Sequence, residues 1–235
     1  MAFKLLAEFQ ALFSGAVYLH RISTHGDRVA GYLYEDLFDL ARSPKYVARV
    51  IDQTRVLNTK NRATGLAARR GDGTFGERVP TVPPRVIPGL AVARASVATI
   101  EIGAEAKILA KAMIKQIDRV CSDMRHQAAE FRKHHENAIC VGIVGINHAS
   151  RMTSYEGKAV WPTDGRIHKH PIQEAAAAEA RITYSAAPDY DEMVFLRFKA
   201  ENAAPFAFTW LNEARTNAEY SSALIRISRE YERRF

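Results

Sequence analysis

The sequence is poor in cysteine, in long apolar runs and in repeated or low-complexity segments. Its two cysteines, Cys121 and Cys140, are too few for a disulfide framework and have no zinc-ligand spacing. No stretch approaches the roughly 18 consecutive apolar residues that a membrane-spanning helix needs. Glu8 and Gln10 interrupt the apolar N-terminus, and no small-residue cleavage site follows, so it is a poor signal peptide. We expect a cytoplasmic protein with two reduced cysteines and no membrane partner.

Acidic residues are also scarce relative to basic ones. The 235 residues include 33 Lys and Arg against 26 Asp and Glu, which gives a formal net charge of +7 and a pI near 9.5. A hydrophobic content of 47% is enough for one packed domain, and 25% charged residues is ordinary for a globular protein, which excludes disorder. A positive excess attracts anionic partners, nucleic acid above all, although a basic protein without such a partner has the same composition.

The excess positive charge is concentrated between residues 55 and 94. Several glycines and prolines share this stretch, so we expect mostly loop with short strands. Its only acids are Asp72 and Glu77. Its basic residues are Arg55, Lys60, Arg62, Arg69, Arg70, Arg78, Arg85 and Arg94. A loop with this imbalance is a candidate for phosphate contact, with Arg69 and Arg70 next to Asp72 as the first candidates.

Three helices are predicted before this loop. The first covers residues 2–22, and the second begins near Asp27, which we take as its N-cap. The third begins at Ser43, where serine caps the helix and the following proline occupies the first helical position. We expect this third helix to turn three apolar side chains inward: Val47, Val50 and Ile51.

A strand, a helix and a second strand follow. Residues 97–102 have β character, residues 108–133 have helical periodicity, and residues 138–146 (AICVGIVGI) form an apolar run of strand length. Such a run is typical of a central strand that is covered on both faces. The spacing predicts a βαβ unit with two parallel strands.

The remainder of the chain continues the α/β pattern without a linker. After a long polar loop we expect a helix at 171–184, strands at 193–199 and 205–211, and a helix from 213 to the end. We therefore predict one α/β domain over residues 1–235. Its parts are a helical N-terminal part (1–57), a core with the metal site (58–147) and a C-terminal elaboration (148–235).

The chemistry is predicted to lie in ATIEIGAEAKIL, which begins at Ala98. In a regular strand, Ile100, Ile102, Ala104 and Ala106 share one face, and Glu101, Gly103, Glu105 and Lys107 share the other. Two carboxylates and an ammonium on a buried face are costly unless they are paired or bind an ion. At ~3.3 Å per residue, Glu105 and Lys107 lie about 6.6 Å apart, which leaves room for a cation and a water.

Glu105-Ala106-Lys107, at the end of an apolar strand and followed by a helix and a second buried strand, resembles the second half of the PD-(D/E)XK motif of restriction-endonuclease-like nucleases. In that superfamily the strand supplies a metal-binding carboxylate and a lysine that positions or activates water. The resemblance, which covers about residues 26–147, implies a restriction-endonuclease-like core with a mixed central sheet flanked by helices. It also implies Mg²⁺-dependent phosphodiester hydrolysis, with Mn²⁺ as a substitute.

The first acid of the motif is not obvious, because the expected Pro-Asp dipeptide is missing. Asp72, in a turn flanked by glycines, is our candidate for the second metal ligand, and Glu77 and Glu101 are its rivals. Glu101 lies about 13 Å from Glu105 along a regular strand, too far for one Mg²⁺. The superfamily often carries an accessory acid on an early helix, and Glu35 is the candidate for that role.

A basic stripe is predicted beside this site. Lys107, Lys111, Lys115 and Arg119 recur every four residues, with Gln116 beside them, so one helix would present them together. We expect Lys111, Lys115, Gln116 and Arg119 to bind nucleic acid, although a stripe of this kind is often only a solvated helix face.

The resemblance implies a Mg²⁺-dependent DNA endonuclease that acts in restriction or phage defence as a homo-oligomer, a dimer or larger. Two alternatives remain open. One is a non-catalytic nucleic-acid-binding or scaffold protein with a degenerate nuclease core. The other is an α/β protein of another kind, in which Glu105 and Lys107 form a structural ion pair.

Overall fold

The computed structural model describes residues 2–20, 22, 24–59, 62–63, 66–69, 72–111 and 113–235, with backbone alone for 62–63, 66–69 and 134. These residues form an α/β fold around a seven-stranded mixed sheet, in the order β11-β10-β7-β6-β4-β1-β5. The sheet strands are β1 (Arg55–Asn58), β4 (Gly73–Arg78), β5 (Arg94–Ala95), β6 (Val97–Leu109), β7 (Ile139–Asn147), β10 (Glu192–Ala200) and β11 (Phe208–Trp210). Two hairpins lie outside the sheet: β2 (Arg62–Ala63) with β3 (Leu66–Arg69), and β8 (Thr153–Glu156) with β9 (Ala159–Pro162).

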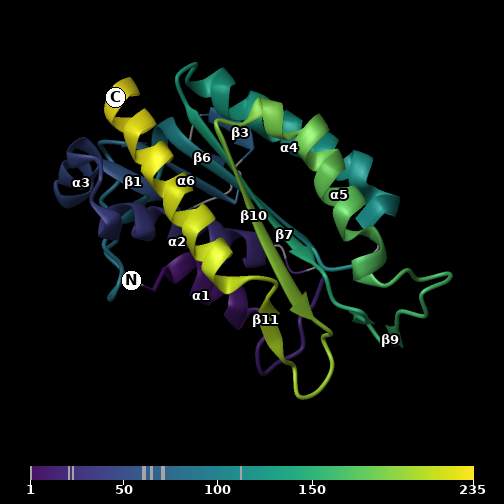
Figure 1. Ribbon diagram of the computed structural model, residues 1–235. Helices are drawn as coiled ribbons and strands as arrows, with labels where there is room; N and C mark the ends of the chain where they lie inside the picture. The colour runs from purple at the N-terminus through teal and green to yellow at the C-terminus, as the bar shows by residue number, and fades with distance from the viewer. Residues whose placement is uncertain are drawn as a thin grey trace.

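Helices cover both faces of the sheet, which makes three layers (Figure 1). One face packs against α1 (Lys4–Ala11), α2 (Thr24–Leu40), α3 (Pro44–Ile51) and α6 (Glu213–Arg234). The other packs against α4 (Met113–His134) and α5 (Pro171–Ser185), and a short 3₁₀ helix, η1 (Ala187–Asp189), follows α5. Two hydrophobic clusters result, one on each side of the sheet.

The βαβ unit predicted from the sequence is confirmed. β6 and β7 are parallel, with Ile102 paired to Ile139 and Leu109 to Ile146, and α4 connects them. Every residue of β7 is buried. β10 pairs with β7 on its other side, also in parallel. The C-terminal residues therefore extend the same sheet instead of forming an appendage.

The N-terminal helices differ from their predicted bounds. α1 ends at Ala11 instead of continuing to residue 22, and Gly15 soon after it has φ +75°, a conformation that an α-helix does not contain. α2 begins at Thr24, so Asp27 lies in its first turn instead of capping it. Ser43 caps α3 as predicted and accepts a hydrogen bond from the Tyr46 N–H at 3.1 Å.

The inward face of α3 was only partly predicted. Val50 is buried as expected, but the side chain of Ile51 is 67% exposed. Tyr46 takes the inward position instead. Its ring lies 4.8 Å from that of Phe75, between centroids, and a large aromatic contact of this kind outweighs the short aliphatic pattern on which the prediction depended.

β6 is longer than predicted, and this changes the basic stripe. The strand runs to Leu109, and α4 begins at Met113 instead of Ile108. Residues 102–109 pair one to one with β7, and these strand contacts override the helical periodicity of the segment. Lys107 is consequently on a strand and Lys111 precedes the helix, so the predicted single helix stripe is wrong.

β6 also has two irregularities where it pairs with β4. Phe75 pairs with Ile102 but Gly76 with Ile100, so Glu101 is an extra residue, and Ala98 is another. A bulge reverses the alternation of the strand. A Cβ at position 76 would lie 1.9 Å from the Thr99 carbonyl oxygen, so only glycine fits opposite the bulge.

Within the part of the chain that the structure describes, every helix is too short or too polar to span a lipid bilayer.

Candidate metal centre

The centre begins where β4 starts beside β6. Gly73, the first residue of β4, pairs with Ala104, so Asp72 lies next to Glu105 on the neighbouring strand. β4 does not continue beyond this point, and the Asp72 carboxylate takes its place as hydrogen-bond acceptor: its Oδ2 lies 2.8 Å from the Ala106 N–H. The side chain of Glu105 is 9% exposed. Asp72, directly before β4, and Glu105 on β6 thus occupy neighbouring positions, with Glu105 buried and Asp72 partly buried.

Lys107 completes the group. It has the same parity on β6 as Glu105, and its Nζ donates a hydrogen bond to Glu105 Oε1 at 2.5 Å. Both residues follow the parity of Gly103, where a Cβ would meet the Phe131 ring of α4, so they face the α4 layer. The structure therefore brings together the three principal residues that the sequence predicted: Asp72, Glu105 and Lys107.

The electrostatics of the centre favour an added cation. Burial, and next the charge of Glu105, raise the pKa of Asp72 to about 7, although the Ala106 N–H and Lys107 act in the opposite direction. Burial would lower the pKa of Lys107, but Glu105 and Asp72 outweigh it, and the pKa is raised. The ammonium is thus charged at neutral pH. With both carboxylates ionised, the three groups carry one net negative charge.

The donor set fits Mg²⁺ better than a transition metal. Among residues 2–20, 22, 24–59, 72–111 and 113–235, no three His, Cys, Asp or Glu side chains are grouped to hold a metal ion. Zn²⁺ sites need three or four protein ligands with nitrogen or sulfur among them. Mg²⁺ is usually held by one or two carboxylates together with waters and substrate phosphates. Asp72 and Glu105 offer that smaller, all-oxygen set.

The two rival acids lie elsewhere. The bulge turns Glu101 to the opposite face of β6 from Glu105, so the predicted shared face is wrong. There the Glu101 carboxylate bonds to Arg55 and accepts from the Tyr231 hydroxyl, with Arg49 at 3.5 Å. Glu77 is exposed on β4.

Glu35 is fully buried on α2, but its contacts are not with the carboxylate pair. Its oxygens accept from the N–H groups of Ala91 at 2.7 Å and Val92 at 3.2 Å. One of them also lies 3.7 Å from Arg94 Nη2. These bonds fix the segment that enters β5. Glu35 thus positions a loop, and its contacts with Ala91, Val92 and Arg94 do not give it the accessory role at the metal that the resemblance implied.

The residues predicted to contact nucleic acid differ in their surroundings. Lys111 is tied into the structure: its Nζ pairs with Glu156 at 2.6 Å and lies 4.6 Å from the Trp161 ring centroid. Lys115, Gln116 and Arg119 are exposed on the first turns of α4. For Arg69 the structure describes only the backbone, and Arg70 lies outside the described residues.

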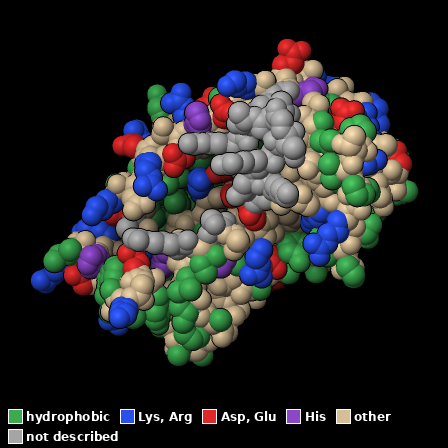
Figure 2. Space-filling model, turned by 180° about the vertical axis from the view of Figure 1, so that it is seen from behind, with side chains coloured by type: hydrophobic (Ala, Val, Ile, Leu, Met, Phe, Trp, Pro, Cys, Tyr) green, Lys and Arg blue, Asp and Glu red, His purple; other side chains and the backbone are tan. Residues whose placement is uncertain are grey.

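A cavity of about 520 Å³ opens beside Lys107. Its wall combines apolar residues with basic and neutral polar side chains and one acid: Lys107, Lys111, Gln116, Arg119 and His20, together with Glu156. On the side of the molecule shown in Figure 2, Lys, Arg, Asp, Glu and His side chains gather around a hollow. An anion entering the cavity would meet several positive charges.

His20 is a member of this wall that the sequence gave no reason to select. Both ring nitrogens are buried and have no hydrogen-bond partner within the described part of the chain. Burial, followed by the charge of Lys111, lowers the pKa of His20 to about 4, so the ring is neutral at pH 7. It lies in a segment without regular structure, and no spacing relates it to Glu105 or Lys107.

Comparison with known proteins adds no relative. No family model matches this chain, and neither a curated protein nor a solved structure matches it. The interpretation of the centre therefore depends on its own residues and geometry.

Proposed function

We propose that this protein is a Mg²⁺-dependent DNA endonuclease with a restriction-endonuclease-like core. The observation that carries the proposal is the placement of Asp72 beside Glu105, with Lys107 hydrogen-bonded to Glu105. Two adjacent carboxylates repel each other, and a structural ion pair requires only one of them. The second carboxylate is explained if the pair binds a cation.

The surrounding topology supports the same proposal. The resemblance requires an acid on a neighbouring strand or turn, and Asp72 directly precedes the neighbouring strand β4. It also requires a helix and a second buried strand after the lysine strand, and α4 and β7 follow β6 in that order. The chain thus lacks the proline of the Pro-Asp dipeptide. In the proposal, Asp72 supplies the acid of that dipeptide from the turn before β4.

In the proposed reaction, Asp72 and Glu105 hold Mg²⁺, which when bound stabilises the developing charge and lowers the pKa of the attacking water. Lys107 keeps its proton because its pKa is raised, so it is not the general base. Its ammonium donates hydrogen bonds and orients the water beside Glu105. Arg119 and Gln116 line the cavity next to Lys107, where they bind the phosphates on either side of the scissile bond.

The biological setting follows from the resemblance alone. Superfamily members usually act as dimers or larger assemblies so that both strands are cut, and many serve restriction or phage defence. We extend both properties to this chain as part of the proposal. Mn²⁺, which accepts the same oxygen ligands, is expected to replace Mg²⁺.

One alternative has structural support. The Lys107–Glu105 contact and the Asp72–Ala106 bond each satisfy a buried group without any metal. A nucleic-acid-binding or scaffold protein with a degenerate nuclease core would keep these contacts and bind DNA without cutting it.

A cleavage assay on plasmid and single-stranded DNA, with Mg²⁺ or with EDTA, distinguishes the endonuclease from the non-catalytic alternative. Asp72→Asn, Glu105→Gln and Lys107→Ala are each expected to slow cleavage by about a hundredfold or more, since each removes several kcal/mol of transition-state stabilisation. Glu77→Gln, which changes an exposed acid on β4, is the matched control and is expected to cleave normally. Normal turnover by folded Lys107→Ala, or no metal-dependent cleavage by the wild type, would refute the nuclease.

A further inference from the structure

A second cavity lies on the other side of Asp72, between α2, the end of β1 and the loop before β5. Its volume is about 360 Å³, within the range of small-molecule sites. Its wall combines apolar and aromatic residues with polar ones and two guanidiniums: Gly31, Tyr32, Leu57, Ile87 and Leu90, with Asn58, Thr59, Arg28 and Arg94. Asp72 and Asp27 also border it. The cavity therefore shares a wall residue with the metal centre.

Arg94 lines this cavity and carries a buried hydrogen-bonding group without a partner among the residues that the structure describes. Its side chain is only 13% exposed, and the unpaired atom is Nη1. Its other terminal nitrogen lies 3.7 Å from Glu35, beyond normal hydrogen-bond length. Buried polar atoms in folded proteins are nearly always paired, so an unpaired guanidinium N–H points to an acceptor supplied by a ligand.

Gly31 indicates that the space is kept open. It is a buried residue inside α2, where glycine costs about 1 kcal/mol relative to alanine. A Cβ at this position would meet its nearest neighbours, Arg94 Nη2 and Leu57 Cδ2, at 3.9 Å, which is an ordinary contact. Packing does not require glycine here. Its absent side chain instead leaves room in the cavity.

We propose that this cavity binds a nucleobase, and guanine most favourably. The flat faces of a base suit the apolar walls, and guanine O6 and N7 accept hydrogen bonds from arginine. Asp27 and Asp72 balance the charges of Arg28 and Arg94, so the wall has no net positive charge that would favour a free anionic group over a neutral base. Because Asp72 borders both sites, one nucleotide can place its base here and its phosphodiester at the Asp72–Glu105 pair.

A base that occupies this cavity is no longer stacked on its neighbours in a duplex. The substrate is therefore a single strand or a duplex with an extruded nucleotide. This inference rests on the proposed function, since the metal centre is what makes a nucleotide the expected occupant. The base itself can come from a nucleic-acid strand or from a free nucleotide.

Binding is measured without metal, in EDTA, so that cleavage plays no part. The probes are dGMP, followed by calorimetry, and a short single strand with one fluorescent guanine analogue whose emission rises when it is unstacked. Gly31→Leu fills the cavity and is expected to weaken binding of both probes at least tenfold, or about 1.4 kcal/mol. Gly31→Ala, the matched control, adds one methyl group and is expected to bind nearly as the wild type does.

Thermal unfolding checks that both Gly31 variants fold, which the helix propensities of alanine and leucine favour. Arg94→Gln is expected to remove the preference for guanine over thymine, whereas Arg85→Gln, an exposed arginine in the same loop, keeps it. Binding of dGMP alone identifies a free nucleotide as the source of the base, and binding of the strand with rising emission identifies nucleic acid.

Equal affinities for folded Gly31→Leu and Gly31→Ala would overturn the base site, whatever the wild type does to DNA. Loss of binding in Gly31→Leu alone supports the base site even if the wild type does not cleave, in which case only the nuclease proposal fails.

Discussion

Two aspartates occupy the same local position in different parts of the sheet. Asp72 directly precedes β4 and accepts a hydrogen bond from the Ala106 N–H of β6. Asp191 directly precedes β10 and accepts one from the Cys140 N–H of β7, also at 2.8 Å. Each carboxylate thus satisfies a backbone donor of the neighbouring strand, and the backbone bond does not distinguish them.

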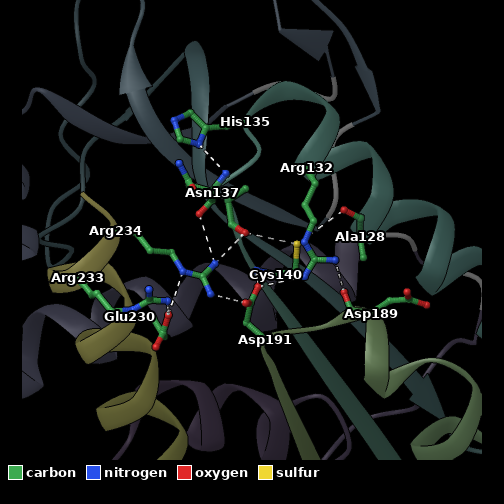
Figure 3. Close-up of polar contacts among 11 residues, drawn as sticks. Ala128, Arg132, His135, Asn137, Cys140, Asp189, Asp191, Glu230, Arg233 and Arg234 are labelled. Atoms are coloured by element: carbon green, nitrogen blue, oxygen red, sulfur yellow. Dashed lines mark hydrogen bonds and ion pairs between the residues drawn. The ribbon is translucent and has the colours of Figure 1, made fainter.

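Their electrostatic surroundings are opposite. Arg234 and Arg132 approach Asp191 at 2.5 and 3.3 Å, as Figure 3 shows. Burial opposes the charge of Asp191, but these contacts outweigh it and hold the pKa below its usual value. At Asp72, burial and next the charge of the neighbouring Glu105 raise the pKa instead. A carboxylate matched by arginines stabilises the fold, whereas one placed against another carboxylate stores repulsion that a bound cation would relieve.

The largest expected difference is in the free energy of unfolding. Asp191→Asn removes a counter-charge shared by Arg132 and Arg234 and is expected to cost about 2 kcal/mol, below the range for a buried pair because Arg234 keeps its ion pair with Glu230 and Arg132 is partly exposed. Asp72→Asn removes repulsion and is expected to cost little or nothing. Urea denaturation of both variants with EDTA present gives the comparison. Equal losses would show that Asp72 is as structural as Asp191.

The pH dependence of the metal-free protein is expected to differ in sign. The pKa of Asp72 rises from 3.8 to about 7 on folding, so the native state holds more protons and loses stability as pH rises between those values. The pKa of Asp191 falls on folding, so its stabilisation is present above pH 3.8 and is lost as pH decreases below that. Both effects are measured by urea denaturation at several pH values between 3 and 8. At each pH the free energy of unfolding of each Asn variant is subtracted from that of the wild type. Two differences with the same slope would contradict the comparison.

The smallest effect concerns the two ends of α4. One end lies beside the Asp72–Glu105 pair, and the other lies beside Asp191 and its arginines. Replacing Lys115 and Arg119 by Gln is expected to flatten the slope of log binding constant against log salt by about 0.9 per lost phosphate contact on duplex DNA. Lys133→Gln, at the far end of the helix, is the matched control and is expected to leave the slope unchanged. Fluorescence anisotropy at several salt concentrations measures it, and equal slopes in all variants would assign Lys115 and Arg119 to a solvated face.

The sequence predicted the central βαβ unit and the grouping of Asp72, Glu105 and Lys107 from local patterns, whereas their role at a metal stays a prediction. The apolar run of β7 is typical of a central strand that is covered on both faces. Glu105 and Lys107 share a face because they are two residues apart on a strand. Asp72 was selected as an acid in a glycine-rich turn, and the antiparallel pairing of β4 with β6 places it there.

The errors arose where tertiary contacts outweigh local pattern. The Lys107, Lys111, Lys115 and Arg119 spacing has helical periodicity, but pairing with β7 keeps Lys107 in a strand. No property of Glu101 marks it as a bulge residue; Gly76, opposite it on β4, is the available signal. His20 and Arg94 could not be selected as candidates from the sequence, because a buried atom without a partner among the described residues is a property of the folded chain alone.

The bulge at Glu101 has a consequence for how this sequence can vary during evolution. It divides one strand into two charge sets on opposite faces: Glu101 with its arginines, and Glu105 with Lys107 and Asp72. A lineage could replace the first set by apolar residues of similar volume and keep its fold, provided that Glu101, Arg49 and Arg55 changed together. The second set has no such freedom if it binds metal. Among homologous sequences, position 101 is therefore expected to covary with 49 and 55, while position 105, four residues away on the same strand, stays acidic.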